Sequence, residues 1–363
     1  MKQEKNTGLL VYNQYLRRKR IALVAALIVT LAAALYSLGI GSIPISLPDI
    51  FAVLTGGGEK MQRTAIMNIR LPRAVTAILV GSALAAAGAV MQCVLRNPLA
   101  SASSLGVSQG AAFGAALGIV VFGGGVVNSA NATTAITINN PYVVTLCAFV
   151  FGMVSTVVVV LISQFKKNVG PAGLILAGTA LSSLFSGAST ILQYFADDTK
   201  LGAIVFWTFG NLGSTNWSEL AILLAALLAA MLYFLFNRWN YNAMESGADT
   251  AKSLGVNTRA VMLVSMGICS LLAAVAVSFV GIISFVGLVA PHIMRKFVGN
   301  DYRYLIPGSA VVGALLLVLA DLVSRTVMAP VILPIGALTS FLGAPMFLFL
   351  LFKGGKKWLK SKT

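Results

Sequence analysis

The chain has 363 residues, of which 58% are hydrophobic and only 10% are charged. A soluble domain carries roughly 25% charged residues, so this composition excludes a soluble protein and indicates one that crosses a membrane several times. The formal net charge of +16 does not indicate nucleic-acid binding. The Lys and Arg residues fall in tails and short connections between apolar runs, which is the pattern that orients membrane proteins.

Ten apolar runs follow one another along the chain as candidate spans of a bilayer core of about 30 Å. They are residues 21–40, 71–93, 99–122, 142–162, 172–196, 218–236, 259–280, 282–293, 306–328 and 335–352. The eighth is the least regular, because Gly281, Gly287 and Pro291 weaken a continuous helix. The sequence therefore predicts an all-α polytopic membrane protein. Basic tails at 1–20 and 354–363 flank a transmembrane domain at 21–353.

The second and third runs are joined by the turn Arg96-Asn97-Pro98, which predicts a tight hairpin at one membrane surface. The third run carries glycines at four-residue intervals. On a helix they fall on one face and let another backbone approach closely. These residues are Gly106, Gly110, Gly114 and Gly118.

The positions of the basic residues predict the orientation in the membrane. With ten spans and the N-terminus inside, 20 of the 26 Lys and Arg residues lie on the inner side. The six on the outer side are Lys60, Arg63, Arg70, Arg73, Lys200 and Arg325. Basic residues concentrate in cytoplasmic segments, so both termini are predicted to be cytoplasmic.

The longest inner connection, residues 237–257, contains a segment from Gly247 to Gly255 that suits a short surface helix. Its residues are small, few are charged, and a glycine stands where a helix would stop. A connection of this length with its own helical pattern is more often functional than not, although an ordinary connector is the alternative.

The segment from Gly281 to Gly299 mixes helix breakers with apolar residues. Non-helical backbone at membrane depth is tolerated only where protein or a water-filled cavity covers it. We therefore expect this segment inside the bundle or beside a pathway, with a kinked packing helix as the alternative. Asp321 and Arg325 are four residues apart near the outer end of the ninth run and fit an ion pair in which Asp321 orients Arg325.

The sequence lacks the residues that several activities require. The nucleotide-binding pattern G-x-x-x-x-G-K-[ST] does not occur. A single histidine, His292, cannot form a metal site alone, and we interpret it as structural. Cys93, Cys147 and Cys269 lie within apolar runs as small buried hydrophobes. An intramembrane enzyme would need a nucleophile–base or metal constellation that the sequence does not show. No series of intramembrane acidic residues exists to relay protons, which disfavours a proton-coupled transporter.

The ordered motifs of this chain resemble those of the FecCD-type permeases, the membrane subunits of ABC importers for iron–siderophore complexes, haem and cobalamin. The resemblance covers about residues 20–353. Its motifs are L-P-R at 71–73, R-N-P-L-A at 96–100, L-G-V-S-Q-G-A at 105–111, L-A-G at 176–178, W-T-F-G-N-L at 207–212, F-V-G-L-V-A-P-H-I-M-R at 285–295, A-D-L-V-S-R at 320–325, and L-P-I-G and L-G-A-P within 333–345. Two positions depart from the family pattern. Ala102 stands where a proline is common, and Ala248 stands where an acidic residue is common.

The resemblance implies a prokaryotic cell-membrane protein that carries substrate and does no covalent chemistry. It implies a dimer, here taken as a homodimer, with the pathway at the dimer interface. Two cytoplasmic ATPase subunits would use ATP, while this chain would bind no cofactor or metal. An extracellular or periplasmic binding protein would deliver the substrate. An ATP-independent secondary transporter or channel for a small polar solute is the alternative function.

The resemblance also implies three sets of functional residues. Arg70, Arg73 and Arg325 match outer arginines that meet glutamates of the binding protein, with anchoring of helix ends as the alternative. Contacts with the ATPase would come from the inner loop through Gly247, Ala248, Asp249, Ala251, Lys252, Leu254 and Gly255. The fifth and tenth runs would line the pathway. In the fifth the candidate lining residues are Thr179, Ser182, Ser183, Ser186, Ser189 and Thr190, with small-residue helix packing as the alternative.

Overall fold

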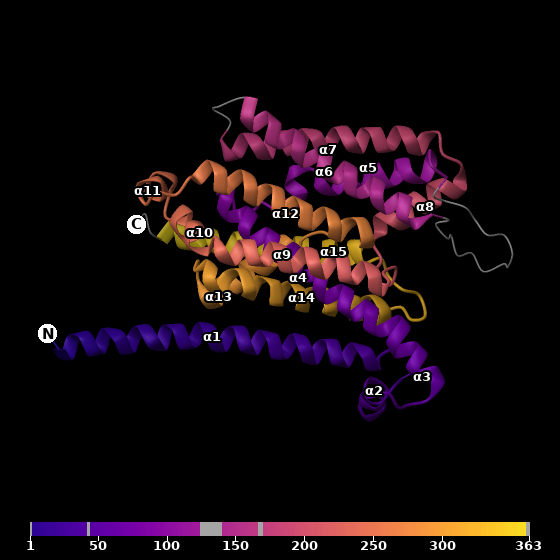
Figure 1. Ribbon diagram of the computed structural model, residues 1–363, viewed down its shortest axis with the longest axis horizontal. Helices are drawn as coiled ribbons and strands as arrows, with labels where there is room; N and C mark the ends of the chain where they lie inside the picture. The colour runs from indigo at the N-terminus through magenta and orange to yellow at the C-terminus, as the bar shows by residue number, and fades with distance from the viewer. Residues whose placement is uncertain (1, 42–43, 124–139, 166–169, 361–363) are drawn as a thin grey trace.

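The computed structural model describes residues 2–41, 44–123, 140–165 and 170–360. Over these residues the protein is all-helical (Figure 1). The elements are α1 (Lys2–Gly39), α2 (Leu47–Leu54), α3 (Lys60–Thr64), a π-helical turn (Ala65–Arg70), α4 (Leu71–Val94), a 3₁₀ turn (Ala102–Leu105), α5 (Val107–Val120), α6 (Pro141–Phe165), α7 (Pro171–Tyr194), α8 (Asp198–Phe209), α9 (Trp217–Phe236), α10 (Arg238–Glu245), α11 (Ala248–Ser253), α12 (Thr258–Val280), α13 (Val286–Val298), α14 (Tyr302–Thr326) and α15 (Ile335–Lys360).

Each of the ten predicted runs contains residues of a helix, so the predicted fold class is confirmed. Among the described residues, seven helical stretches are long and apolar enough to cross a membrane. They are α1, the continuous stretch from α3 to α4, α6, α7, α9, α12 and α14. The apolar helices α5 and α15 are shorter, and α13 is interrupted by Pro291. The start of α1, the end of α15 and the short helices α10 and α11 lie at the same end of the bundle (Figure 1).

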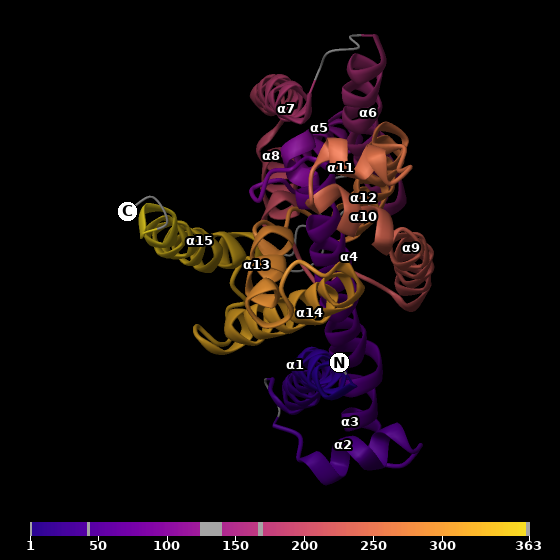
Figure 2. The same cartoon turned by 90° about the vertical axis from the view of Figure 1, so that its left-hand side faces the viewer.

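Helix α4 forms the centre of the bundle and nearly all of its residues are buried. It packs against α14, α12, α13 and α9, as both views show (Figures 1 and 2). Two glycines of α4 permit these close approaches. A Cβ at Gly81 would overlap the backbone of Gly313 in α14, and a Cβ at Gly88 would overlap the carbonyl group of Gly287 in α13. Small residues therefore allow one helix to serve as a shared packing surface.

The glycine face predicted for the third run is confirmed for three of its four residues. Gly110 and Gly114 lie against the backbone of α6 at Phe151 and Cys147, and Gly118 lies against Val144. Gly106 precedes the helix and is not part of this face. The predicted tight hairpin between residues 93 and 99 is wrong, because α5 begins only at Val107. Residues 102–105, which precede it, form a 3₁₀ turn instead of a helix.

The sequence before α5 favours a turn over a helix. Ser101 and Ser104 bond each other's backbone in a capping box around the 3₁₀ turn, the kind of local bonding with which serine competes against helix. Gly106 follows at φ +84°, a left-handed conformation that glycine adopts at little cost. These contacts shorten α5 to 14 residues.

The irregular segment predicted after residue 280 is confirmed. Residues 281–284 are outside any helix, Gly281 and Phe285 have φ of +78° and +64°, and Ile283 is buried. Protein therefore covers the unwound backbone at this depth, as its hydrogen-bonding groups require. His292 lies on α13 and makes a near-perpendicular ring contact with Phe347 of α15.

Candidate functional site

Three arginines and one aspartate meet at the end of the bundle predicted to be outside. Arg73 of α4 donates through Nε to Oδ1 of Asp321 at 2.7 Å, and Arg325 of α14 donates through Nε to Oδ2 at 2.9 Å. Asp321 is 2% exposed. The predicted pair between Asp321 and Arg325 is confirmed, and the structure adds Arg73 as a second partner. A buried carboxylate needs such charge-assisted hydrogen bonds to remain ionised.

Two of these arginines also hold the end of α1. Arg70 donates through Nη1 to the carbonyl of Leu38 at 2.8 Å, and Arg325 donates to the carbonyl of Ile40 at 3.0 Å. The last carbonyls of a helix lack partners within the helix and carry partial negative charge, which cations stabilise. We call Arg70, Arg73, Asp321 and Arg325 the outer ionic cluster. It ties the outer ends of α1, α4 and α14 together.

The structure brings the three predicted arginines together but does not expose them. Arg70 and Arg73 are each only 8% exposed, and the side chain of Arg325 is 11% exposed. The sequence pattern placed them on an open charged surface, and burial among α1, α4 and α14 corrects that expectation. Their hydrogen-bonding capacity is not exhausted, because Nη2 of Arg73 is buried without a partner among the described residues.

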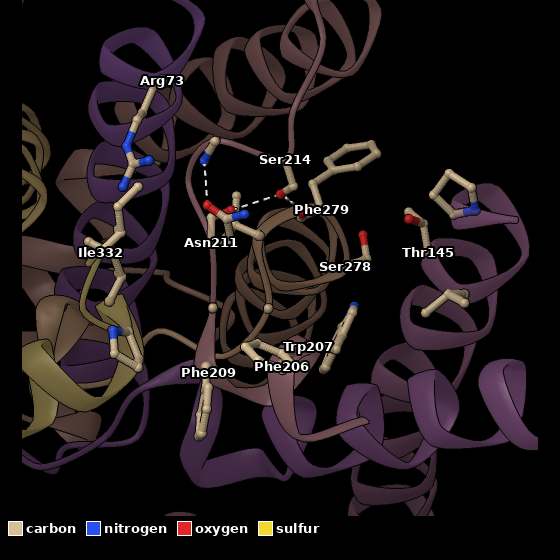
Figure 3. Close-up of a pocket in the computed structure, with 18 of the residues that line it drawn as sticks. Arg73, Thr145, Phe206, Trp207, Phe209, Asn211, Ser214, Ser278, Phe279 and Ile332 are labelled. Carbon is tan, nitrogen blue, oxygen red and sulfur yellow. Dashed lines mark hydrogen bonds between the residues drawn. The ribbon is translucent and has the colours of Figure 1, made fainter. Parts of the chain in front are cut away.

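A cavity of about 540 Å³ adjoins Arg73 (Figure 3). Aromatic residues of α8, namely Phe206, Trp207 and Phe209, form part of its wall. Ser214 lies opposite and donates its hydroxyl to the carbonyls of Asn211 at 2.8 Å and Phe279 at 3.2 Å. The cavity combines an apolar wall, several hydroxyl or amide groups and one guanidinium. Cavities of this size and lining are typical of small-molecule or side-chain binding sites.

Helix α8, which forms this wall, was missed by the sequence prediction. It has 12 residues and is too short to cross a membrane. A signal existed, because Asp197 caps its N-terminus by accepting from the backbone N–H of Lys200 at 2.8 Å. Asp197-Asp198 followed by an apolar run could therefore have indicated a helix start.

The hydroxyl residues predicted to line the pathway divide between two faces of α7. Thr179, Ser183, Ser186 and Thr190 are exposed, at spacings of four, three and four residues. That spacing defines one face of a helix, and this face is turned away from the rest of the chain. Ser182 is half-buried and Ser189 is buried, and each donates to a carbonyl of α7. The structure thus groups four of the six candidates.

The short surface helix predicted in the inner loop is present as α11. Gly247 before it and Gly255 after it have φ of +125° and +81°, so glycine suits both ends. Ala251 is fully buried against the bundle, whereas Leu254 is 68% exposed. Asp249 and Lys252 form an exposed ion pair at 3.5 Å. An exposed leucine with a solvated ion pair beside it provides an apolar centre and a polar rim, as small contact surfaces do.

A second ionic group supports this inner end. Asp301, before α14, accepts from Lys19 of α1 at 3.3 Å and from Arg303 at 2.8 Å. Asn242 of α10 also donates to it at 3.4 Å. Partial burial raises the pKa of Asp301, but the hydrogen bonds from Arg303 and Lys19 outweigh it and lower the pKa to about 2. The carboxylate is therefore ionised at neutral pH and joins α1, α10 and α14.

Comparison with known proteins identifies the family. The FecCD transport family matches residues 28–353. An ABC transporter permease protein of Methanocaldococcus jannaschii is 48% identical over 346 residues, covering 95% of this chain and 98% of that protein. The hemin transport system permease protein HmuU of Yersinia pestis is 35% identical, covering 92% and 96%.

A solved structure supports the same identification. It is described as an inward-facing conformation of a metal-chelate type ABC transporter, and it superposes with a TM-score of 0.79 at 33% identity, covering 91% of this chain and 98% of that chain. The chain therefore belongs to the FecCD transport family and is a non-catalytic, multi-pass membrane permease of the ABC transporter class.

Proposed function

We propose that this permease carries a metal chelate of the iron–siderophore, haem or cobalamin type into a prokaryotic cell. The observation that carries the proposal is the full-length match to relatives named for such substrates. Besides the hemin permease, the iron(3+)-hydroxamate permease FhuB of Bacillus subtilis is 37% identical over 332 residues. The vitamin B12 import permease BtuC of Escherichia coli is 35% identical over 332 residues.

Membership of an ABC transporter family implies an ATPase and a binding protein as partners, with ATP used by the ATPase. We propose two ATPase subunits and a second copy of this chain, with the pathway between the two copies. The exposed hydroxyl face of α7 supports that arrangement, because four hydroxyl residues facing lipid would gain nothing from their polarity. Thr179 and Thr190 donate to carbonyls of α7 at 2.8 and 3.0 Å, so their oxygens remain as acceptors. Such a wall offers weak, exchangeable contacts to a bulky chelate.

We propose that the outer ionic cluster docks the binding protein. Within the outer ionic cluster, three guanidinium groups against one carboxylate leave a local positive excess, and Nη2 of Arg73 can still donate. An acidic side chain entering beside the cavity would pair with that guanidinium. The alternative is that these arginines only anchor helix ends, and their contacts with α1 support it as well. The two roles are compatible, because an arginine fixed by Asp321 presents its remaining donors in a set direction.

We propose that residues 247–255 contact the ATPase. The exposed Leu254 supplies apolar area for a partner groove, and buried Ala251 seats α11 on the bundle. A movement of the partner would then be transmitted through α10 and α11 to the helices that they touch.

The substrate proposal is tested by identifying the ligand of the cognate binding protein. Ferric hydroxamates, ferric catecholates, haem and cobalamin are titrated against the purified binding protein by fluorescence quenching. The chelate that binds is then offered to cells with and without this permease. We expect uptake only with the permease. Binding of a metal-free solute, with no chelate taken up, would contradict the proposal.

A further inference from the structure

A second cavity, of about 360 Å³, lies at the inner end of the bundle. Its walls come from the end of α4, the link between α10 and α11, and α13. Its polar and charged lining includes Gln92, Arg96, Glu245 and Arg295, with Gly247 beside them. Apart from Gly247, none of them belongs to the docking, coupling or pathway sets. The volume is near the lower limit of about 300–1,000 Å³ for small-molecule sites, which suits a small polar ligand and not a chelate.

The charge in this cavity is positive. Neither Arg96 nor Arg295 forms an ion pair within the part of the chain that the structure describes. Glu245 also lines the cavity and offsets one of these two charges, which leaves one positive charge in excess. Its two oxygens accept from Asn300 at 2.6 Å and from the Tyr302 hydroxyl at 3.1 Å, and that hydroxyl accepts from Arg295 at 3.4 Å. A cavity lined by two guanidinium groups and one carboxylate that already has partners suits an anion.

Two lining residues carry buried atoms without partners among the described residues, and they differ in chemistry. One is Nε of Arg295, a donor, and the other is Oε1 of Gln92, an acceptor. Gln92 is 3% exposed, and its Nε2 donates to the carbonyl of Leu288 at 3.3 Å, which fixes the amide orientation. A buried polar atom without a partner destabilises the folded protein, and a ligand that pairs with it removes this penalty. A ligand that suits both atoms must accept hydrogen bonds and also donate one.

This requirement selects among anions. Sulfate, chloride and a carboxylate near neutral pH only accept hydrogen bonds. A phospholipid phosphodiester also has no O–H. Inorganic phosphate near neutral pH keeps at least one P–OH beside its charged oxygens, so it can accept from arginine and donate to Gln92. We propose that this cavity binds inorganic phosphate, with Arg96 and Arg295 contacting its oxygens and Gln92 accepting from its P–OH. The ligand would join α4 and α13 to Gly247 at the start of α11.

The test uses the purified permease alone in nanodiscs of zwitterionic lipid, so it is independent of transport. Thermal unfolding is followed while phosphate, sulfate or dimethyl phosphate is added at constant ionic strength. We expect a saturable rise in unfolding temperature with phosphate and at least about tenfold weaker binding of the other two. Dimethyl phosphate stands for the lipid headgroup. No saturable effect of phosphate, or equal effects of phosphate and sulfate, would overturn the proposal.

Two variants assign the contacts. Arg96→Gln removes an exposed guanidinium and should weaken phosphate binding at least about tenfold, since hydrogen bonds to charged groups contribute about 1.5–3 kcal/mol. Gln92→Met removes the acceptor and should abolish the preference for phosphate over sulfate. Lys296→Gln is the control, because Lys296 neighbours Arg295 in the sequence but does not line the cavity. Unchanged affinity in Arg96→Gln, or an equal loss in Lys296→Gln, would refute the assignment.

Discussion

Asp321 of α14 accepts a hydrogen bond of 2.7 Å from Arg73 of α4, a residue 248 positions earlier in the chain. Because Arg325 uses the second oxygen of the same carboxylate, one buried aspartate serves two guanidinium groups. We predict that Asp321→Asn destabilises the permease by about 3–5 kcal/mol, since it leaves two buried cations without their anion. Thermal unfolding in detergent measures this. Asp249→Asn, which alters an exposed ion pair, should have almost no effect. Similar stability of both variants would show that the cluster contributes little.

Docking of the binding protein is predicted to depend on the planar guanidinium group of Arg73. Arg73→Lys keeps the charge near Asp321 but removes the planar pair of donors that can hold a second carboxylate. We expect the affinity for the binding protein to fall about tenfold while stability changes little. The control is Arg63→Lys on α3, an exposed arginine at the same end of the bundle. Affinity equal to that of the wild type would leave only the helix-anchoring role. Charge reversal at Arg73 is a poorer experiment, because a carboxylate beside Asp321 would unfold the site.

Glycine packing yields a prediction in which two similar substitutions have opposite effects. Gly88→Ala places a methyl group against the carbonyl of Gly287. It should lower the free energy of unfolding of the permease by about 1–3 kcal/mol or more. Gly267 of α12 has open space around its Cβ position, so Gly267→Ala should be neutral or stabilise by up to about 1 kcal/mol. Thermal unfolding of the two variants compares them directly. A common sign for both would contradict the packing described for α4.

Coupling to the ATPase is predicted to require Leu254. Leu254→Asp should abolish ATP-driven uptake without loss of stability, because the side chain is 68% exposed and contributes little to the fold. Co-purification of the ATPase and uptake are the two measurements. Leu254→Met is the matched control and should keep both. A charged residue at Ala251 is uninformative, since that position is fully buried and folding itself would suffer.

The pKa of Asp301, lowered to about 2, predicts a dependence of stability on pH. A lowered pKa in the folded state contributes stability above the unfolded value of 3.8, and this contribution is lost as the pH falls toward 2. After solvent screening is allowed for, we expect about 1–2 kcal/mol at neutral pH. The stability difference between wild type and Asp301→Asn should be constant above about pH 5 and shrink below about pH 4. A stability difference that does not vary with pH would show that packing, and not the charge of Asp301, causes it.

The helices could be predicted from the sequence where length and apolarity alone decide, as in α6, α9 and α12. The start of α5 could not, because Ser101, Ser104 and Gly106 compete with helix through bonds that composition does not reveal. The burial of the outer arginines also escaped prediction. A basic residue at the end of a span is expected to be exposed unless its ion-pair partner is known. The partner of Arg73 is Asp321 on α14, far away in the sequence. The presence of α11 was predictable because glycines bracket it, whereas the inner cavity depends on three segments that only folding brings together.

ATP-driven uptake in proteoliposomes distinguishes an ABC importer from a secondary transporter. The permease is reconstituted with its cognate ATPase, the binding protein is added outside, and radiolabelled chelate uptake is measured with or without ATP inside the vesicles. We expect uptake only when ATPase, binding protein and ATP are all present, with no dependence on an imposed sodium or proton gradient. Uptake by the permease alone, driven by an ion gradient and unaffected by ATP, would contradict it and establish a secondary transporter.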